Sequence, residues 1–306
     1  MTAVWQSYRN AFKNYLTLER SLADNSIEAY LRDVDKLREF LELEGHALTP
    51  FQVTESHVLA YLKYLTDVGL SAFSQARMLS GLKAFYRYLR FENLIQTDPT
   101  QHLEGPRLGR KLPDTLAVPE IDALLEAVDL STPAGARDRA MLEVLYSSGL
   151  RVSELLGLRL TNCFFDIGFI RIVGKGGKMR LVPIGQDAMH YTRLYVEHVR
   201  SQFDIQKAGE DVVFLNQRGK PLTRVFVFKM IRKLAADAGV QKTIGPHTFR
   251  HSFATHLIEG GADLRAVQQM LGHESITTTE IYTHLDRDYL RQMMIDYHPR
   301  AQKPPR

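Results

Sequence analysis

The sequence predicts a mainly α-helical protein with one small antiparallel β-sheet, an α+β fold in two domains. Apolar residues recur at three- and four-residue spacing through most of the chain, which is the helical period. Residues 163–185 break this period with β-branched segments punctuated by glycines, which is typical of short strands and tight turns. A chain of 306 residues, 44% of them hydrophobic, is long enough to bury two separate cores.

The first domain is expected over residues 1–104 as a four-helix bundle. Short connections between amphipathic helices are typical of that architecture. Ser26 and Ser56 are placed to cap the second and third helices, and Gly45 and Gly69 are placed to end them. The expected helices cover residues 8–19, 26–45, 56–69 and 71–93.

Residues 105–114, GPRLGRKLPD, read as a linker, because glycine, proline and basic residues without periodicity break both helices and strands. A basic linker could follow a phosphate backbone, or it could be a solvated tether; these residues alone do not decide between the two.

The second domain is expected over residues 115–306. The tail helix is amphipathic, with Leu290, Met293, Met294 and Tyr297 on one face, and the basic, proline-rich residues 298–306 are expected to be mobile. Helices are expected at 121–128, 140–149, 190–203, 223–239, from Pro246 to Gly260 and at 288–297, with the sheet at 163–185.

The composition limits the possible partners and compartment. A net charge of +4 suits a polyanionic partner without proving one. The single cysteine, Cys163, excludes an internal disulfide, fits a reducing cytosol and reads as a buried apolar residue. Residues 1–12 lack the apolar core of a signal peptide, and no run is long enough to span a bilayer. The sequence therefore predicts a cytoplasmic protein with no membrane association.

Chemistry-bearing residues gather between positions 247 and 284. His247 and Arg250 are three apart on a helix that begins near Pro246, so they share one face, while Phe249 and Phe253 can anchor another face in the core. The signal from this pair alone is weak, because a histidine followed three residues later by an arginine is expected about once by chance in a chain with this many histidines.

Further candidates lie on either side of that pair. His273 follows Leu271-Gly272 at an expected helix end, and Tyr282 follows nine residues later on a helix that Ser275 can cap. Alone, Tyr282 is more often a core tyrosine and His273 a helix-terminal histidine. Upstream, Arg151 lies in SSGLRVSELLGL and Lys175 in the turn VGKGGKMRLVPIG, where exposed lysines are also ordinary. The joint order of all six is far more specific than any part.

In this order and spacing, the chain resembles the tyrosine site-specific recombinases, and most closely the Xer type that resolves chromosome dimers. The resemblance covers nearly the whole chain, and all six catalytic positions are kept. It implies an N-terminal SAM-like core-binding domain and a C-terminal catalytic domain whose tail helix packs into a neighbouring subunit. It also places the hairpin lysine at Lys175, with Lys178 as its competitor.

The reaction assigns a role to each position. A phosphodiester under attack gains negative charge, which Arg151 and Arg250 can each bind with forked donors, and His273 can add a third hydrogen bond. Removing one such donor typically costs roughly 3–4 kcal/mol. Tyr282 is the expected nucleophile; a phenol has a pKa near 10, so ionising it at pH 7 costs roughly 4 kcal/mol. His247 is the candidate to take that proton, and Lys175 can protonate the leaving oxygen. No metal or cofactor is expected.

Two neighbouring residues have supporting roles in this scheme. Glu154 follows Arg151 by three and reads as the partner that orients it. His251 follows His247 by four and could belong to a metal pair, but no third ligand lies at a usual spacing, so a structural hydrogen bond is favoured.

The candidate DNA-binding residues Arg77, Lys83, Arg87 and Arg90 lie on one expected helix. A solvated basic face explains them equally well. The resemblance implies instead that this domain grips DNA opposite the catalytic domain, with cations on phosphates.

The predicted function is a site-specific recombinase that cuts and rejoins double-stranded DNA through a 3′-phosphotyrosyl intermediate, without ATP. The resemblance implies a homo-tetramer, or a hetero-tetramer with a second Xer-type recombinase, and a DNA translocase as a possible activator. The alternatives are a mobile-element integrase, a type IB topoisomerase-like enzyme that swivels one duplex, a non-catalytic DNA-binding protein and, least favoured, a metallohydrolase.

Overall fold

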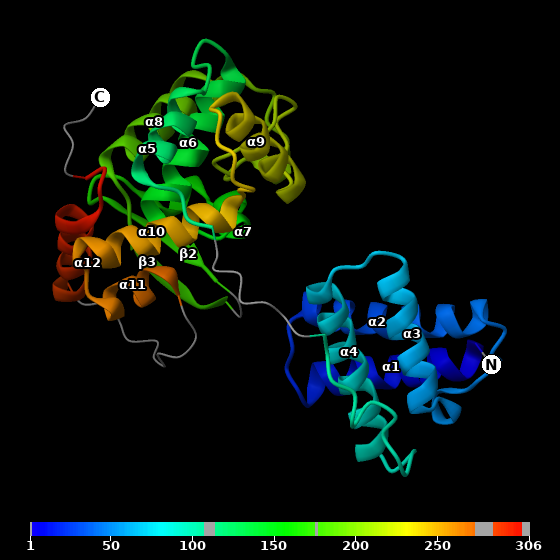
Figure 1. Ribbon diagram of the computed structural model, residues 1–306. Helices are drawn as coiled ribbons and strands as arrows, with labels where there is room; N and C mark the ends of the chain where they lie inside the picture. The colour runs from blue at the N-terminus through cyan, green and yellow to red at the C-terminus, as the bar shows by residue number, and fades with distance from the viewer. Residues whose placement is uncertain (1, 107–113, 175–176, 273–283, 302–306) are drawn as a thin grey trace. The chain divides into compact units, whose positions relative to one another are not determined.

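The computed structural model describes residues 2–106, 114–174, 177–272 and 284–301. The chain divides into two compact units, Met1–Lys111 and Leu112–Arg306 (Figure 1). The expected assignment of residues 105–114 as a linker falls largely outside the described residues and stays a prediction.

The first unit is a helical bundle with its own apolar core. Phe12, Leu37, Leu82 and Phe85 are all fully buried in it, and α2 packs along α4. Its helices are α1 (Thr2–Leu18), α2 (Asp24–Leu43), α3 (Glu55–Asp67) and α4 (Ala72–Phe91), with a short 3-10 turn at Pro50–Gln52.

Two of the predicted helix caps are wrong. Helix α2 begins two residues before Ser26, at Asp24, and the backbone N–H of Thr54 donates to Nδ1 of His57 at 3.1 Å, so Thr54 rather than Ser56 starts α3. In both cases the serine lies inside the first helical turn, because the backbone changes from extended to helical before it reaches the serine. The predicted ends are confirmed, since Gly45 and Gly69 adopt left-handed φ angles of 76° and 75°.

The second unit is built around α6, in which every residue from Arg139 to Ser148 is buried. Helices α5, α7, α8 and α10 pack against it. The helices are α5 (Val118–Glu126), α6 (Pro133–Ser148), α7 (Val152–Leu156), α8 (Gln186–His198), α9 (Arg224–Asp237), α10 (Pro246–Gly260), α11 (Leu264–Leu271) and α12 (His284–Tyr297), with 3-10 turns at Leu160–Asn162, Arg200–Gln202 and Lys207–Gly209.

The sheet has three antiparallel strands in the order β1 (Cys163–Phe164), β2 (Phe169–Val173) and β3 (Met179–Pro183). Its register pairs Ile172 with Arg180 and Ile170 with Val182. Because alternate residues face opposite sides of a strand, Arg180 and Val182 share the buried face of β3. The predicted mainly α fold with a small antiparallel sheet is confirmed, and one charged side chain lies on the core side of that sheet.

Helices α10, α11 and α12 lie together beside β3 (Figure 1). The apolar face expected on the tail helix is covered within the same chain, since Leu290 and Met294 are buried in the core of the second unit. Among the described residues, no helix is both long enough and apolar enough to cross a bilayer.

The expectation of a mobile end is wrong for residues 298–300. The His298 ring is buried within hydrogen-bonding distance of the Tyr146 carbonyl, at 3.4 Å. The Arg300 guanidinium forms ion pairs with the carboxylates of Asp122, Glu143 and Asp187 at 2.8, 3.0 and 2.7 Å. The basic residue that suggested solvent exposure is instead neutralised by three helices, α5, α6 and α8.

Candidate active site and DNA-binding surface

Arg151 begins a short helix directly after the central helix ends. Gly149 adopts a left-handed φ of 57° and stops α6, so the chain turns and Arg151 becomes the N-cap of α7. The Arg151 Nη1 donates to Oε1 of Glu154 at 3.0 Å, and 42% of the Arg151 side chain remains exposed. The arginine is thus held on one side and open to solvent on the other.

Glu154 is the partner of Arg151 that its spacing predicts. Its Oε2 also accepts the backbone N–H of Arg151 at 2.9 Å. Burial acts to raise the pKa of Glu154, but the hydrogen bonds and charge of Arg180, followed by those of Arg151, outweigh it and lower the pKa below its ordinary value. Glu154 is therefore an ionised carboxylate that holds two arginines.

Arg250 reaches from α10 to the ends of two other helices. Its Nη1 donates to the carbonyl of Gly149 at 2.7 Å, and its Nη2 donates to the carbonyl of Leu271 at 2.7 Å. Both carbonyls lie at helix C-termini, where the helix dipole favours a cation. Burial, together with the charge of Arg151, lowers the pKa of Arg250 to about 10, so the side chain is charged at pH 7.

The end of α11 completes this cluster. Gly272 ends the helix in a left-handed conformation with φ of 67°, and its carbonyl lies 3.5 Å from Nη2 of Arg151. The ends of α6 and α11 therefore bring Arg151 and Arg250 to one place, which their distance in sequence does not by itself require.

Of the other predicted catalytic residues, the structure describes only His247. His247 lies exposed in the first turn of α10, and no hydrogen bond of its ring appears among the described residues. Phe249 and Phe253 anchor α10 in the core, as predicted. Lys175, His273 and Tyr282 lie outside the described residues, so their roles stay predictions.

The sequence prediction missed Arg180. Its guanidinium is buried and donates to both oxygens of Glu154, at 2.9 Å each. The strand alternation of MRLVP was an available signal, because it places Arg180 on the same face as Val182, where a charge needs a partner.

The alternative chemistries gain no support from the described residues. The Cys163 thiol is half-buried rather than fully buried and donates to the carbonyl of Arg159 at 3.3 Å; burial raises its pKa to about 12. Within the described parts of the chain, no three histidine, cysteine or acidic side chains gather as metal ligands, and His251 lies exposed.

The four predicted DNA-binding residues lie on α4. Arg77 and Arg87 are exposed, as is Arg90, while Lys83 is half-buried. Arg77 forms an ion pair with the buried carboxylate of Asp33 on α2, and Nη1 of Arg90 donates to Oε1 of Gln101 at 3.2 Å. The first domain therefore carries several exposed cations on α4, and neighbouring side chains hold Arg77 and Arg90 in place.

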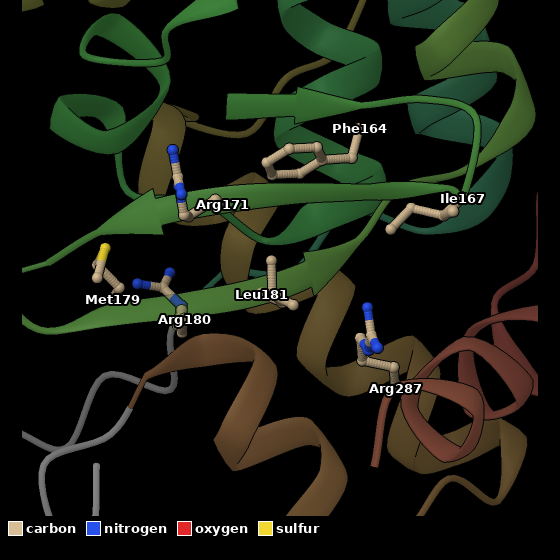
Figure 2. Close-up of a pocket in the computed structure, with 7 residues that line it drawn as sticks. All are labelled: Phe164, Ile167, Arg171, Met179, Arg180, Leu181 and Arg287. Carbon is tan, nitrogen blue, oxygen red and sulfur yellow. The ribbon is translucent and has the colours of Figure 1, made fainter. Parts of the chain in front are cut away.

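A pocket of about 460 Å³ lies against the sheet (Figure 2). Arg171 and Arg180 of the strands and Arg287 of α12 stand around an apolar lining. The pocket shares Arg180 with the cluster described above, but its lining includes neither Arg151 nor Arg250. The apolar lining residues are Phe164, Ile167, Met179 and Leu181.

Comparison with known proteins decides the family. The family described as "Phage integrase family" matches residues 114–288, and "Phage integrase, N-terminal SAM-like domain" matches residues 10–93. The chain belongs to the phage integrase family. The predicted SAM-like first domain and tyrosine-recombinase second domain are thereby confirmed.

Similar curated proteins cover almost the whole chain. A "Tyrosine recombinase XerD" from Chlorobaculum tepidum is 42% identical over 97% of this chain and 98% of its own length. A protein of the same name from Staphylococcus saprophyticus is 44% identical over 95% of this chain and 98% of its own length. The predicted enzyme class, a tyrosine recombinase that transfers DNA strands at specific sites, is confirmed by this family membership.

Solved structures share the fold. A XerH site-specific recombinase in a post-cleavage complex with its difH substrate is 25% identical, with a TM-score of 0.69 over 94% of this chain and 84% of that chain. A lambda integrase dimer bound to a core site is 18% identical, with a TM-score of 0.67 over 90% of this chain and 98% of that chain, and shows the fold alone.

Proposed function

We propose that this recombinase resolves chromosome dimers, with Tyr282 as its nucleophile. The observation that carries the proposal is the convergence of Arg151 and Arg250 at the ends of α6 and α11. The relatives named as XerD recombinases support the cellular role.

In the proposed cleavage step, the Tyr282 phenol oxygen bonds to phosphorus and the bond from phosphorus to the 5′ oxygen breaks. The phenol proton passes to His247, and the 5′ oxygen takes a proton from Lys175. Arg151 and Arg250 bind the non-bridging oxygens with His273 and stabilise their added charge. The 3′-phosphotyrosyl bond keeps the energy needed for rejoining, so no ATP is consumed.

Double-stranded DNA is the proposed partner of both domains. The exposed cations of α4 would contact phosphates, while the arginine cluster of the second domain would hold the phosphate under attack. The similar XerH recombinase supports this, since its solved structure is a complex with a difH DNA substrate.

The proposed assembly is a tetramer on two duplexes, of this chain alone or with a second Xer-type recombinase, in the cytoplasm and with a DNA translocase as activator. The apolar face of α12, which includes Leu290 and Met294, would leave its own domain to pack on a neighbour. Mass measurement of the protein–DNA complex would give four protein copies on two duplexes; a stable complex of one copy on one duplex would contradict this assembly.

A plasmid with two directly repeated target sites tests the function. The sites come from chromosomal fragments of the replication-terminus region that the protein binds. The expected result is excision of the segment between the sites by the unmodified protein, alone or with its partner, and none by Tyr282→Phe. Relaxation of a one-site plasmid without excision would favour a type IB topoisomerase-like enzyme. Tight binding without relaxation or excision would favour a non-catalytic DNA-binding protein.

A further inference from the structure

Arg180 is a buried cation on the core side of β3. Only 8% of its side chain is exposed. A buried guanidinium is costly unless it is fully paired, so its contacts carry information about its role.

Each nitrogen of the Arg180 guanidinium has a partner. Nη1 and Nη2 donate to the two oxygens of Glu154 at 2.9 Å each, in the bidentate geometry that arginine favours with a carboxylate. Nε donates to the carbonyl of Met270 at 2.9 Å, in the last turn of α11. Arg180 therefore joins β3 to both α7 and α11.

Gly272 fits tightly against the same guanidinium. A Cβ added there would lie 3.1 Å from Cδ, Cζ and Nε of Arg180. The carbonyl of Gly272 in turn lies 3.5 Å from Nη2 of Arg151. The two arginines thus contact the same helix end, one from the interior and the other from the exposed side.

The charged side chains of Glu154, Arg180 and Arg151 differ in how far they are exposed to solvent. Glu154 carries one negative charge and is 5% exposed, while Arg180 and Arg151 carry one positive charge each and are 8% and 42% exposed. With Arg180 in place, the buried carboxylate is neutralised from the interior, and the exposed arginine keeps its charge for an anion. Without Arg180, Glu154 and Arg151 would form a neutral pair, which would stabilise the charge that develops on a phosphate under attack less strongly.

We infer that Arg180 is a positioning residue of the recombinase: it neutralises Glu154 and fixes the end of α11, so that Arg151 stays oriented and charged toward the scissile phosphate. This inference rests on the proposed function of Arg151. It assigns Arg180 no contact with DNA.

The test compares single-turnover cleavage of a nicked duplex, at saturating protein and 25 °C, with equilibrium binding of the same duplex. We expect Arg180→Met to cleave about 100-fold more slowly with binding within about threefold, because the loss affects the transition state. Arg180→Lys, which keeps the charge but loses the fork, should fall between Arg180→Met and the unmodified protein.

A second substitution separates this role from a merely structural one. Adding Glu154→Gln to Arg180→Met removes the carboxylate that would neutralise Arg151, so we expect the double variant to regain about tenfold in cleavage rate over Arg180→Met. Thermal unfolding selects variants that are folded at 25 °C. If Arg180→Met does not fold, Arg180→Lys and the double variant still test the inference, each compared with the unmodified protein and with Glu154→Gln alone.

Two outcomes would overturn the inference. Folded Arg180 variants that cleave within about threefold of the unmodified protein would exclude the role, as would a double variant no faster than Arg180→Met. An unmodified protein that forms no Tyr282-dependent adduct would instead overturn the proposed function, so the two failures are distinguishable.

Discussion

Arg250 uses its two terminal nitrogens inside the protein, on the carbonyls that end α6 and α11. These bonds fix the plane of the guanidinium before any substrate binds. A preorganised donor of this kind needs no reorganisation when charge develops on the phosphate. The residue is therefore both a structural link between two helix ends and a candidate for binding the transition state.

Arg250→Lys is expected to slow cleavage by about 100- to 1,000-fold, because an ammonium cannot replace the two parallel donors. Binding of the duplex should stay within a few-fold. Single-turnover cleavage and equilibrium binding check this, with Arg265→Lys on the exposed surface of α11 as the matched control. Cleavage at the unmodified rate would show that the fork of Arg250 is not needed.

Gly272→Ala combines two costs at one position. The left-handed backbone alone costs roughly 1–2 kcal/mol for an alanine, and the new Cβ would also displace Arg180. Gly168→Ala is a matched control, since Gly168 has φ of 75° and nothing within 4 Å of an added Cβ. We expect both variants to lower the unfolding free energy but only Gly272→Ala to slow cleavage. Equal cleavage rates would contradict the proposed packing of Arg180.

At the scale of an element, α4 carries exposed cations and also packs on α2. The ion pair of Arg77 with the buried Asp33 holds one of these cations at the interface between the two helices. Burial raises the pKa of Asp33 above its ordinary value, against the lowering effect of Arg77. Such a helix can present charge in a fixed pattern instead of a mobile one.

Arg87→Ala should weaken DNA binding and lower the slope of log K against log salt by about 1, which is the change expected from one lost phosphate contact. Lys13→Ala removes an exposed cation from α1 of the same domain and serves as the control. A salt titration of binding measures both. If the two variants weaken binding equally, α4 has no special place in the interface.

The elements differ in how far the sequence predicts them. The three- and four-residue spacing of apolar residues was sufficient to predict helices in both domains, and β-branched segments between glycines were sufficient to predict the small antiparallel sheet. Helix starts were predicted less well, because Thr54 and Ser56 both suit an N-cap and only the backbone decides between them. Arg151, Arg250 and Glu154 could be predicted as a set. Arg180 could not be matched to Glu154, since that pairing depends on how β3 packs against α7.

At the scale of the whole molecule, the residues that follow α12 hold several elements of the second unit together. Arg300 links α5, α6 and α8 through three carboxylates, and His298 lies buried against Tyr146 of α6. No local pattern in residues 298–306 predicts this, because proline and basic residues usually indicate an exposed end. The contacts tie the fold of the catalytic unit to the position of α12.

The burial of His298 predicts a pH dependence of stability. Burial lowers its pKa from 6.5 to about 3, so between these values the unfolded chain binds a proton that the folded chain does not. The contribution of buried, neutral His298 to the unfolding free energy should be complete above pH 6.5. It should fall as the pH is lowered, with about 2 kcal/mol lost by pH 5.

Unfolding free energies between pH 7 and 5 check this, with His298→Gln as the comparison, because glutamine can still donate to the Tyr146 carbonyl but does not titrate. The variant should lose less stability on acidification. It should retain part of the dependence, since burial also lowers the pKa of neighbouring His256. An unchanged slope would exclude His298 as the source.

We propose that Tyr282 attacks a DNA phosphate that Arg151 and Arg250 bind. The most direct test of this proposal is covalent capture on a nicked duplex in EDTA, followed by mass spectrometry of the digested adduct. We predict a nucleotide attached to the peptide that contains Tyr282, and no adduct with Tyr282→Phe. An adduct on another residue, or one that persists in Tyr282→Phe, would contradict the account.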